Sequence, residues 1–302
     1  MRRSLSYNHI TYLAAAVTII FWASAFVGIR ATIDAYSAGS LALLRYLISS
    51  VLMAVLFYTQ NQKPTKLEGK DWFYILILGL LGFSIYNVAL NSGERTVPAG
   101  IASFIISLIP VFMTVLAYFF LKEPVSKRGW LGVAVSICGI LVIAIAQQVG
   151  FALDLGVLLV CISALSAAAF HVMQKPMLRR FSVVELNTYA IWAGTAAMLV
   201  YTPQLLHDVS SASFNSTMWV FYLGIFPGAI AYMSWSFVLS RVPASIAASY
   251  IFTLPLVATC MGVLMLHERP NVLSLVGGVI ALLGAILVNF RKRSLEMKHS
   301  PE

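Results

Sequence analysis

Ten apolar stretches, each about as long as a helix that crosses a lipid bilayer, set the main limit on how this chain can fold. They lie at 10–29, 38–58, 72–90, 98–121, 130–147, 155–174, 183–203, 218–239, 244–266 and 272–290. A spanning helix needs about 20 apolar residues, because each residue adds about 1.5 Å and the hydrocarbon core is about 30 Å thick. Of the 302 residues, 60% are hydrophobic and only 10% are charged, too few charges to cover a water-soluble surface. We therefore expect an all-α membrane protein with ten transmembrane helices and no soluble domain.

The positive charges predict the orientation of these helices. If the N-terminus is cytoplasmic, sixteen of the 20 Lys and Arg residues fall on cytoplasmic segments, and only Arg30, Arg95 and Arg269 face outward. Membrane proteins show this asymmetry widely, and it predicts that both termini are cytoplasmic. It also accounts for the net charge of +9 without nucleic acid as a partner. We expect a multi-pass protein of the cell (inner) membrane.

The chain repeats itself at a spacing of 145 residues. The sequence VPAGIA at 97–102 returns as VPASIA at 242–247, and the same spacing relates Pro110 to Pro255. It also relates Glu123 to Glu268. In the first helix, a spacing of 144 residues takes Trp22 to Ser166 and Phe26 to Phe170. These matches predict two five-helix repeats, 1–149 and 150–302.

An odd number of helices in each repeat determines their relative direction. Because five is odd, the second repeat must cross the membrane in the direction opposite to the first. Such inverted repeats are typical of secondary transporters, whose two halves exchange conformations and open a central site to each side in turn. The alternative is that duplication only built a stable bundle, as in a membrane scaffold.

Several short motifs resemble a known family. They are Phe21-Trp22-Ala23-Ser24-Ala25-Phe26, Leu44-Arg45-Tyr46, the Pro-Ala pairs at 98 and 243, Leu121-Lys122-Glu123-Pro124 and Leu266-His267-Glu268-Arg269-Pro270. With the repeat, this set resembles the EamA-type branch of the drug/metabolite transporter superfamily. The resemblance implies export or exchange of small metabolites, often amino acids, through a central cavity. It further implies that helices 1, 3, 4, 6, 8 and 9 line this cavity and that helices 5 and 10 are peripheral.

Polar and aromatic side chains recur at helical spacing in the same helices. The candidate substrate-binding residues are Trp22, Ser24, Tyr86, Asn87, Phe104, Ser107, Ser166, Phe170, Tyr232, Trp235, Tyr250 and Thr253. Polar groups inside a membrane are expected to face protein or a water-filled cavity. The alternative is that these side chains only hold helices together, as Ser and Thr often do.

Three further features bear on the site. Pro110 and Pro255 lie mid-helix, where each removes an N–H donor, and matched helix breaks in two repeats indicate a transport site. Arg45 is the basic residue that lies inside a span. It is interpreted either as a charge partner for a substrate carboxylate or as a paired structural arginine. His171 is expected at the membrane–water interface. No Asp or Glu lies mid-membrane, which weakens schemes with a buried carboxylate that carries a proton.

These features favour a transporter that exports amino acids, aromatic or otherwise apolar, or related amphiphiles by alternating access. The alternatives are a scaffold or sensor without transport, or a transporter of cationic drugs. We expect no enzyme activity, cofactor or metal, since no nucleophile–base pair, metal cluster or phosphate loop is present. The expected partners are a small-molecule substrate and the lipid bilayer, in a monomer or weak dimer.

Overall fold

The computed structural model describes residues 2–59, 64–120, 125–146, 155–241 and 250–296, and these residues form helices joined by short loops. The first half contains α1 (Arg2–Arg30), α2 (Ala38–Thr59), α3 (Gly69–Gly79), η1 (Leu80–Ile85), α4 (Tyr86–Gly93), α5 (Ala99–Ile106), α6 (Ile109–Phe120) and α7 (Lys127–Ala146). The second half contains α8 (Leu155–Met177), α9 (Val183–Met198), η2 (Leu199–Tyr201), α10 (Thr202–Ser211), α11 (Phe214–Ile225), η3 (Phe226–Ile230), α12 (Ala231–Arg241), α14 (Leu254–Leu266) and α15 (Val272–Glu296). The motifs at 121–124 and 242–247 lie outside the described residues.

The helices have the length and surface of membrane spans. Within the described ranges, seven helical segments are long and apolar enough to cross a bilayer, and two shorter apolar helices follow at Leu254–Leu266 and Val272–Val288. Large apolar side chains such as Leu13, Val51 and Leu264 are exposed on the outside of the bundle. Such a surface suits lipid rather than water. The chain is a multi-pass, all-α membrane protein.

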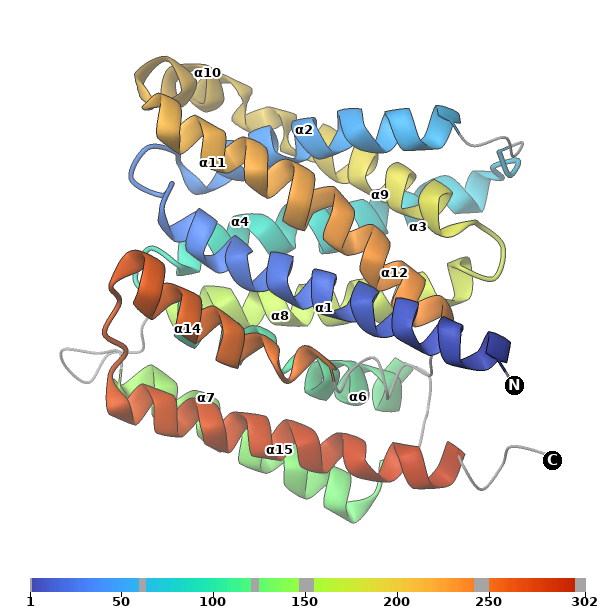
Figure 1. The fold of residues 1–302 in the computed structure, drawn as a ribbon, viewed down its shortest axis with the longest axis vertical. Coiled ribbons are helices and arrows are strands. Elements are labelled where there is room, and N and C mark those ends of the chain that lie inside the picture. The colour runs from blue at the N-terminus through green and yellow to red at the C-terminus, as the bar shows by residue number, and fades with distance from the viewer. Residues whose placement is uncertain (1, 60–63, 121–124, 147–154, 242–249, 297–302) are drawn as a thin grey trace.

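The two halves run in opposite directions. Figure 1 shows that α1 begins, and α15 ends, at the same side of the bundle. In this view α1 runs away from that side and α8, the first helix of the second half, runs toward it. This arrangement agrees with two inverted five-helix repeats.

The fourth and ninth spans are interrupted at equivalent positions. α5 ends at Ile106 and α6 begins at Ile109, so the helix breaks at residues 107–108. Residues 252–253 form the corresponding turn before α14. Pro110 and Pro255 each occupy the second position of the helix that follows, where a missing N–H donor costs nothing. The breaks therefore lie 145 residues apart, one turn before each proline.

A second pair of irregular turns interrupts the third and eighth spans. η1 and η3 are π-helical turns; η1 ends directly before Tyr86, and η3 ends two residues before Tyr232. π turns insert an extra residue into a helix and are frequent at functional sites. The hydrophobic pattern did not predict them, because the residues on both sides of each turn remain apolar.

The helices α7 and α15 pack closely at one edge of the bundle (Figure 1). Gly132 lies against the backbone of Gly284, and Gly139 lies against Gly277 and Ala281. Small residues allow this close approach of two helices in a membrane. The glycines therefore serve internal packing, and both helices are peripheral, as the resemblance implied.

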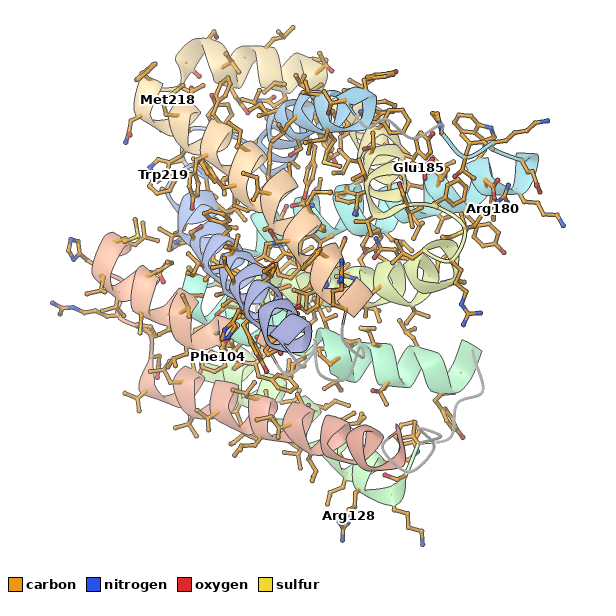
Figure 2. The ribbon with its side chains drawn as sticks, turned by 45° about the vertical axis from the view of Figure 1, so that its right-hand side comes forward. Phe104, Arg128, Arg180, Glu185, Met218 and Trp219 are labelled. Carbon is orange, nitrogen blue, oxygen red and sulfur yellow. The ribbon has the colours of Figure 1, made fainter. Side chains whose placement is uncertain are left out.

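The two halves also contact each other near the start of α3. Arg180, which follows α8, forms ion pairs with Asp71 at 2.9 Å and Glu68 at 3.1 Å, and Figure 2 shows Arg180 beside α3.

A further helix, α10, occupies part of the loop expected after the seventh span. Its Asp208 accepts a hydrogen bond from the backbone of Ser37 at 2.9 Å, which joins α10 to the start of α2.

Candidate functional site

A cavity lies in the middle of the bundle, between the two halves. Its lining consists of Trp22, Ala25, Phe26, Arg45, Tyr86, Leu90, Ile106, Ile109, Ala167, His171, Tyr232, Ile251 and Leu254. All six spans implied by the resemblance contribute, and α2 adds Arg45. The interior surface is thus apolar and aromatic with a few polar groups, as small-molecule sites generally are.

The lining follows the internal repeat. Ile106 and Ile109 flank the break in the first half, and Ile251 and Leu254 flank the break in the second. Each pair of equivalent residues is separated by 145 positions. Backbone without helical hydrogen bonds is tolerated at this depth only where protein or water surrounds it. The two breaks therefore border the cavity at related places.

The first helices of the two halves, α1 and α8, contribute residues at equivalent positions to the cavity. Trp22 and Ala167 line it, as do Phe26 and His171, and both pairs are 145 residues apart. This differs by one residue from the spacing of 144 expected for this helix, which would have paired Trp22 with Ser166. A shift of one residue turns a helix position by about 100°, so the structure turns Ser166 away from the cavity.

Arg45 is the charged residue of the cavity. It is 3% exposed, and its Nη1 donates to Oδ1 of Asn87 at 3.1 Å. Asn87 in turn donates to the hydroxyl of Tyr46 at 3.1 Å and to the carbonyl of Phe83 at 2.8 Å, so the amide is held in place. The Arg45 Nε has no hydrogen-bond partner, and the ion pairs found in the described part of the chain do not include Arg45. The Nε–H of the guanidinium is thus an unused hydrogen-bond donor.

Aromatic rings form one wall of the cavity. The Trp22 ring lies 5.5 Å from Tyr232 and 5.4 Å from Trp235, centroid to centroid. Trp235 does not line the cavity itself but supports Trp22 from behind, and its buried Nε1 has no partner. His171, on the same repeat as Trp235, also has a buried nitrogen, Nδ1, without a partner. His171 was expected at the interface, and the structure instead places it on the cavity.

The other predicted residues lie outside the lining. The Ser24 hydroxyl is 2.7 Å from that of Tyr222, and the hydroxyls of Ser107, Ser166 and Thr253 donate to the carbonyls of Ser103, Leu81 and Tyr250. Such bonds hold helices or local turns together.

Three predicted aromatic residues also contact other helices. Phe104 packs against Gly278 of α15, between α5 and α15 as Figure 2 shows. Phe170 packs on Gly82, and Tyr250 contacts Tyr12 with ring centroids 6.2 Å apart. These rings shape the surroundings of the cavity rather than its surface.

The model of the EamA-like transporter family matches twice, at residues 9–145 and 154–290. The chain belongs to the EamA-like transporter family. The two matches begin and end 145 residues apart, the same spacing as the equivalent residues of the cavity. The protein is accordingly a membrane transporter with two copies of the family unit.

Similar proteins agree with this assignment. "Uncharacterized transporter YdfC" of Bacillus subtilis is 37% identical over 276 residues, covering 90% of this chain and 88% of the relative. A "Probable terminal-alkyne amino-acid exporter" of Streptantibioticus cattleyicolor is 35% identical over 279 residues, covering 92% and 93%. A solved crystal structure matches with a TM-score of 0.64 over 95% of this chain and 98% of the other, at 18% identity, which supports the fold alone. The family and these relatives are transporters rather than enzymes, and their substrates are small molecules.

Proposed function

We propose that the protein exports amino acids with aromatic or other apolar side chains, or related amphiphiles, across the cell (inner) membrane by alternating access. The two repeats, 1–149 and 150–302, are the moving units, and both chain ends are cytoplasmic. The observation that supports this proposal most directly is the burial of Arg45, which is in none of the ion pairs of the described residues, on a cavity lined by aromatic and aliphatic groups. The name of the Streptantibioticus relative points to the same class of substrate.

Arg45 suits the carboxylate of an amino acid. A buried cation without an ion pair is costly in a membrane, and a substrate carboxylate would supply the missing partner. Guanidinium groups bind carboxylates through charge-assisted hydrogen bonds, and the free Nε of Arg45 provides a donor. Asn87 holds the other side of the guanidinium, so we assign Asn87 a positioning role.

The rest of the lining suits the apolar side chain and the ammonium group of an amino acid. Trp22, Tyr86 and Tyr232 offer ring surfaces, and stacked rings contribute about 0.5–1.5 kcal/mol beyond simple burial. A substrate ammonium group would gain about 0.5–2 kcal/mol over such a ring. Since no acid lines the cavity, a cation without a carboxylate would face Arg45 without compensation. This favours zwitterions over cationic drugs.

The decisive experiment is counterflow in proteoliposomes that contain the purified protein and unlabelled phenylalanine. Uptake of labelled phenylalanine is compared with that of leucine, alanine, threonine and phenethylamine, which has the ring and the ammonium but no carboxylate. We expect phenylalanine and leucine to exchange and phenethylamine to fail. Exchange of phenethylamine alone, measured in vesicles loaded with unlabelled phenethylamine, would support a transporter of cationic drugs. Binding of phenylalanine without any exchange would support a sensor.

Arg45→Ala tests the assigned charge partner within the same assay. We expect this variant to lose phenylalanine exchange, while Arg128→Ala, a substitution on the outside of the bundle (Figure 2), leaves exchange unchanged.

The cavity is lined by both halves of one chain, so we propose that a monomer, or a weak dimer of independent units, is sufficient for transport.

A further inference from the structure

Glu94, which follows α4, is a buried carboxylate without a partner. Its side chain is 0% exposed, and neither carboxylate oxygen has a hydrogen-bond partner. Burial raises the pKa of the Glu94 carboxyl well above its ordinary value, and the neighbouring Glu268 carboxylate raises it further, while Arg30 and Arg45 lower it. A charged carboxylate is costly in such a place and a neutral one much less so. The sequence placed Glu94 in a loop, and the structure buries it.

Charged groups from several elements surround Glu94. Arg30, at the end of α1, donates to the backbone carbonyl of Glu94 and, at 3.1 Å, to that of Arg95. The Arg30 Nε also lies 3.5 Å from Oε1 of Glu268. Arg45 acts on Glu94 from α2, whereas Arg95, on the same loop, donates to the carbonyl of Tyr36 at 3.3 Å.

The residues of α8 that lie nearest to this turn carry no charge. α8 presents Gly156 and Val160 to Gly93, the residue before Glu94. Within the described residues, the charged groups that act on the Glu94 carboxyl are therefore Arg30, Arg45 and Glu268. Two of these are cations, and one of the two, Arg30, is paired with Glu268.

The ion pair between Arg30 and Glu268 joins the two halves of the protein. Arg30 belongs to the first half and Glu268 follows α14 in the second. Glu268 also accepts hydrogen bonds from the backbone N–H of Ala99, at 3.1 and 3.2 Å, which ties the end of α14 to the start of α5. These contacts close the bundle at the side opposite to the chain ends (Figure 1), the side predicted to face outward.

Glu94 lies between this closure and the cavity. Leu90, one helical turn earlier, lines the cavity, whereas the Arg30 side chain is 30% exposed. A proton can therefore reach the carboxylate from the outer surface when the contacts around Arg30 part.

We propose that Glu94 is the proton-binding residue that couples export of the substrate to inward movement of protons, an inference that rests on the proposed function. While Glu94 is neutral, Arg30 remains paired with Glu268 and the outer side stays closed. When Glu94 loses its proton, its carboxylate competes with Glu268 for Arg30, and the closure weakens. The proton is taken up from outside as the outer side closes, and it leaves toward the cytoplasm before the loaded transporter opens outward again.

The test uses proteoliposomes of the whole protein with a lumen one pH unit more acidic than the bath. The measured quantity is the accumulation of labelled phenylalanine with this gradient, divided by the accumulation at equal pH. Exchange of one proton per substrate sets an upper limit of about tenfold, because a tenfold gradient corresponds to about 1.4 kcal/mol. We expect a ratio well above one for the unchanged protein, loss of this ratio with a protonophore, and alkalinisation of the lumen reported by a trapped pH dye.

The substitution Glu94→Gln keeps the shape of the side chain and removes the titrating group. We expect its ratio to fall to one and the dye signal to disappear, while Glu94→Asp, which keeps a carboxyl, restores part of both. Glu68→Gln is the matched control, because Glu68 is an exposed acid (68%) in an ion pair at the other side of the bundle, and we expect it to keep the ratio of the unchanged protein.

The outcomes separate this inference from the proposed function. Counterflow with a ratio of one in the unchanged protein overturns proton coupling and leaves amino-acid transport intact. A normal ratio in Glu94→Gln overturns the role of Glu94. Absence of counterflow in the unchanged protein overturns the proposed function, and proton coupling with it.

Discussion

Nη1 of Arg45 lies 3.1 Å from Oδ1 of Asn87, and this hydrogen bond fixes the guanidinium of α2 against α4 at the edge of the cavity. The amide therefore orients the charge without neutralising it. An aspartate at the same position would have nearly the same shape and would neutralise the guanidinium.

We expect Asn87→Asp to weaken the binding of amino acids. The new carboxylate would pair with Arg45 and compete with the substrate carboxylate, and the loss of about 1.5–3 kcal/mol from a charged hydrogen bond corresponds to about a tenfold to hundredfold higher KM for phenylalanine. Phenethylamine should gain in relative uptake. An unchanged KM for phenylalanine would show that Arg45 does not bind the carboxylate.

Trp22→Ala should reduce transport of aromatic substrates more than that of small ones. Trp22 lies on the cavity against Tyr232, and loss of one ring contact worth about 0.5–1.5 kcal/mol lowers kcat/KM for phenylalanine by about twofold to tenfold. The measurement is the ratio of phenylalanine to alanine uptake. Tyr86→Ala should act in the same direction, and Trp72→Ala, an exposed tryptophan of α3, is the control. Equal loss for both substrates would mean that the rings only support packing.

Gly139→Val should destabilise the protein. A Cβ at Gly139 would meet the backbone of Ala281 and would lie 2.6 Å from the carbonyl oxygen of Gly277. Backbone atoms cannot move aside as side chains can, so we expect a loss of about 1–3 kcal/mol, seen as a lower unfolding temperature in detergent. Gly69→Ala, where nothing lies within 4 Å, should leave the unfolding temperature unchanged. Equal unfolding temperatures for both variants would contradict the close packing of α7 against α15.

The predicted orientation can be tested with single cysteines. In a variant whose three native cysteines are replaced by serine, Thr96→Cys should react with an impermeant thiol reagent added outside intact cells. Arg241→Cys should react only after the cells are opened. Both positions are exposed. Reaction of both from the same side would contradict the inverted repeat.

The architecture could be predicted from the sequence because the bilayer imposes it locally. Each apolar stretch must be long enough to cross the membrane and must satisfy its own backbone hydrogen bonds, so all ten expected regions contain helix in the described residues. The repeat and the paired helix breaks could be predicted for the same reason, since Pro110 and Pro255 each affect the backbone of their own helix.

The lining of the cavity was less predictable because it depends on how each helix is rotated. A π turn adds a residue, which redirects every side chain beyond it. η1 has no sequence signature, and the Pro227-Gly228 pair of η3 indicates an interrupted helix without specifying a π turn. Hydroxyl groups such as that of Ser166 can bond to a neighbouring backbone as readily as face a cavity. His171 and Glu94 were missed because their burial arises from helices distant in the sequence.

Arg45 makes a nearly symmetric site unsymmetric. At the spacing of 145 residues, the position equivalent to Arg45 is Ala190, a buried residue without charge. If Arg45 binds the substrate carboxylate as proposed, a substrate has one polarity in the cavity, with its carboxylate on the first repeat. In the proposed mechanism the first repeat would then hold the substrate, and the second repeat would move around a bound molecule that keeps its orientation.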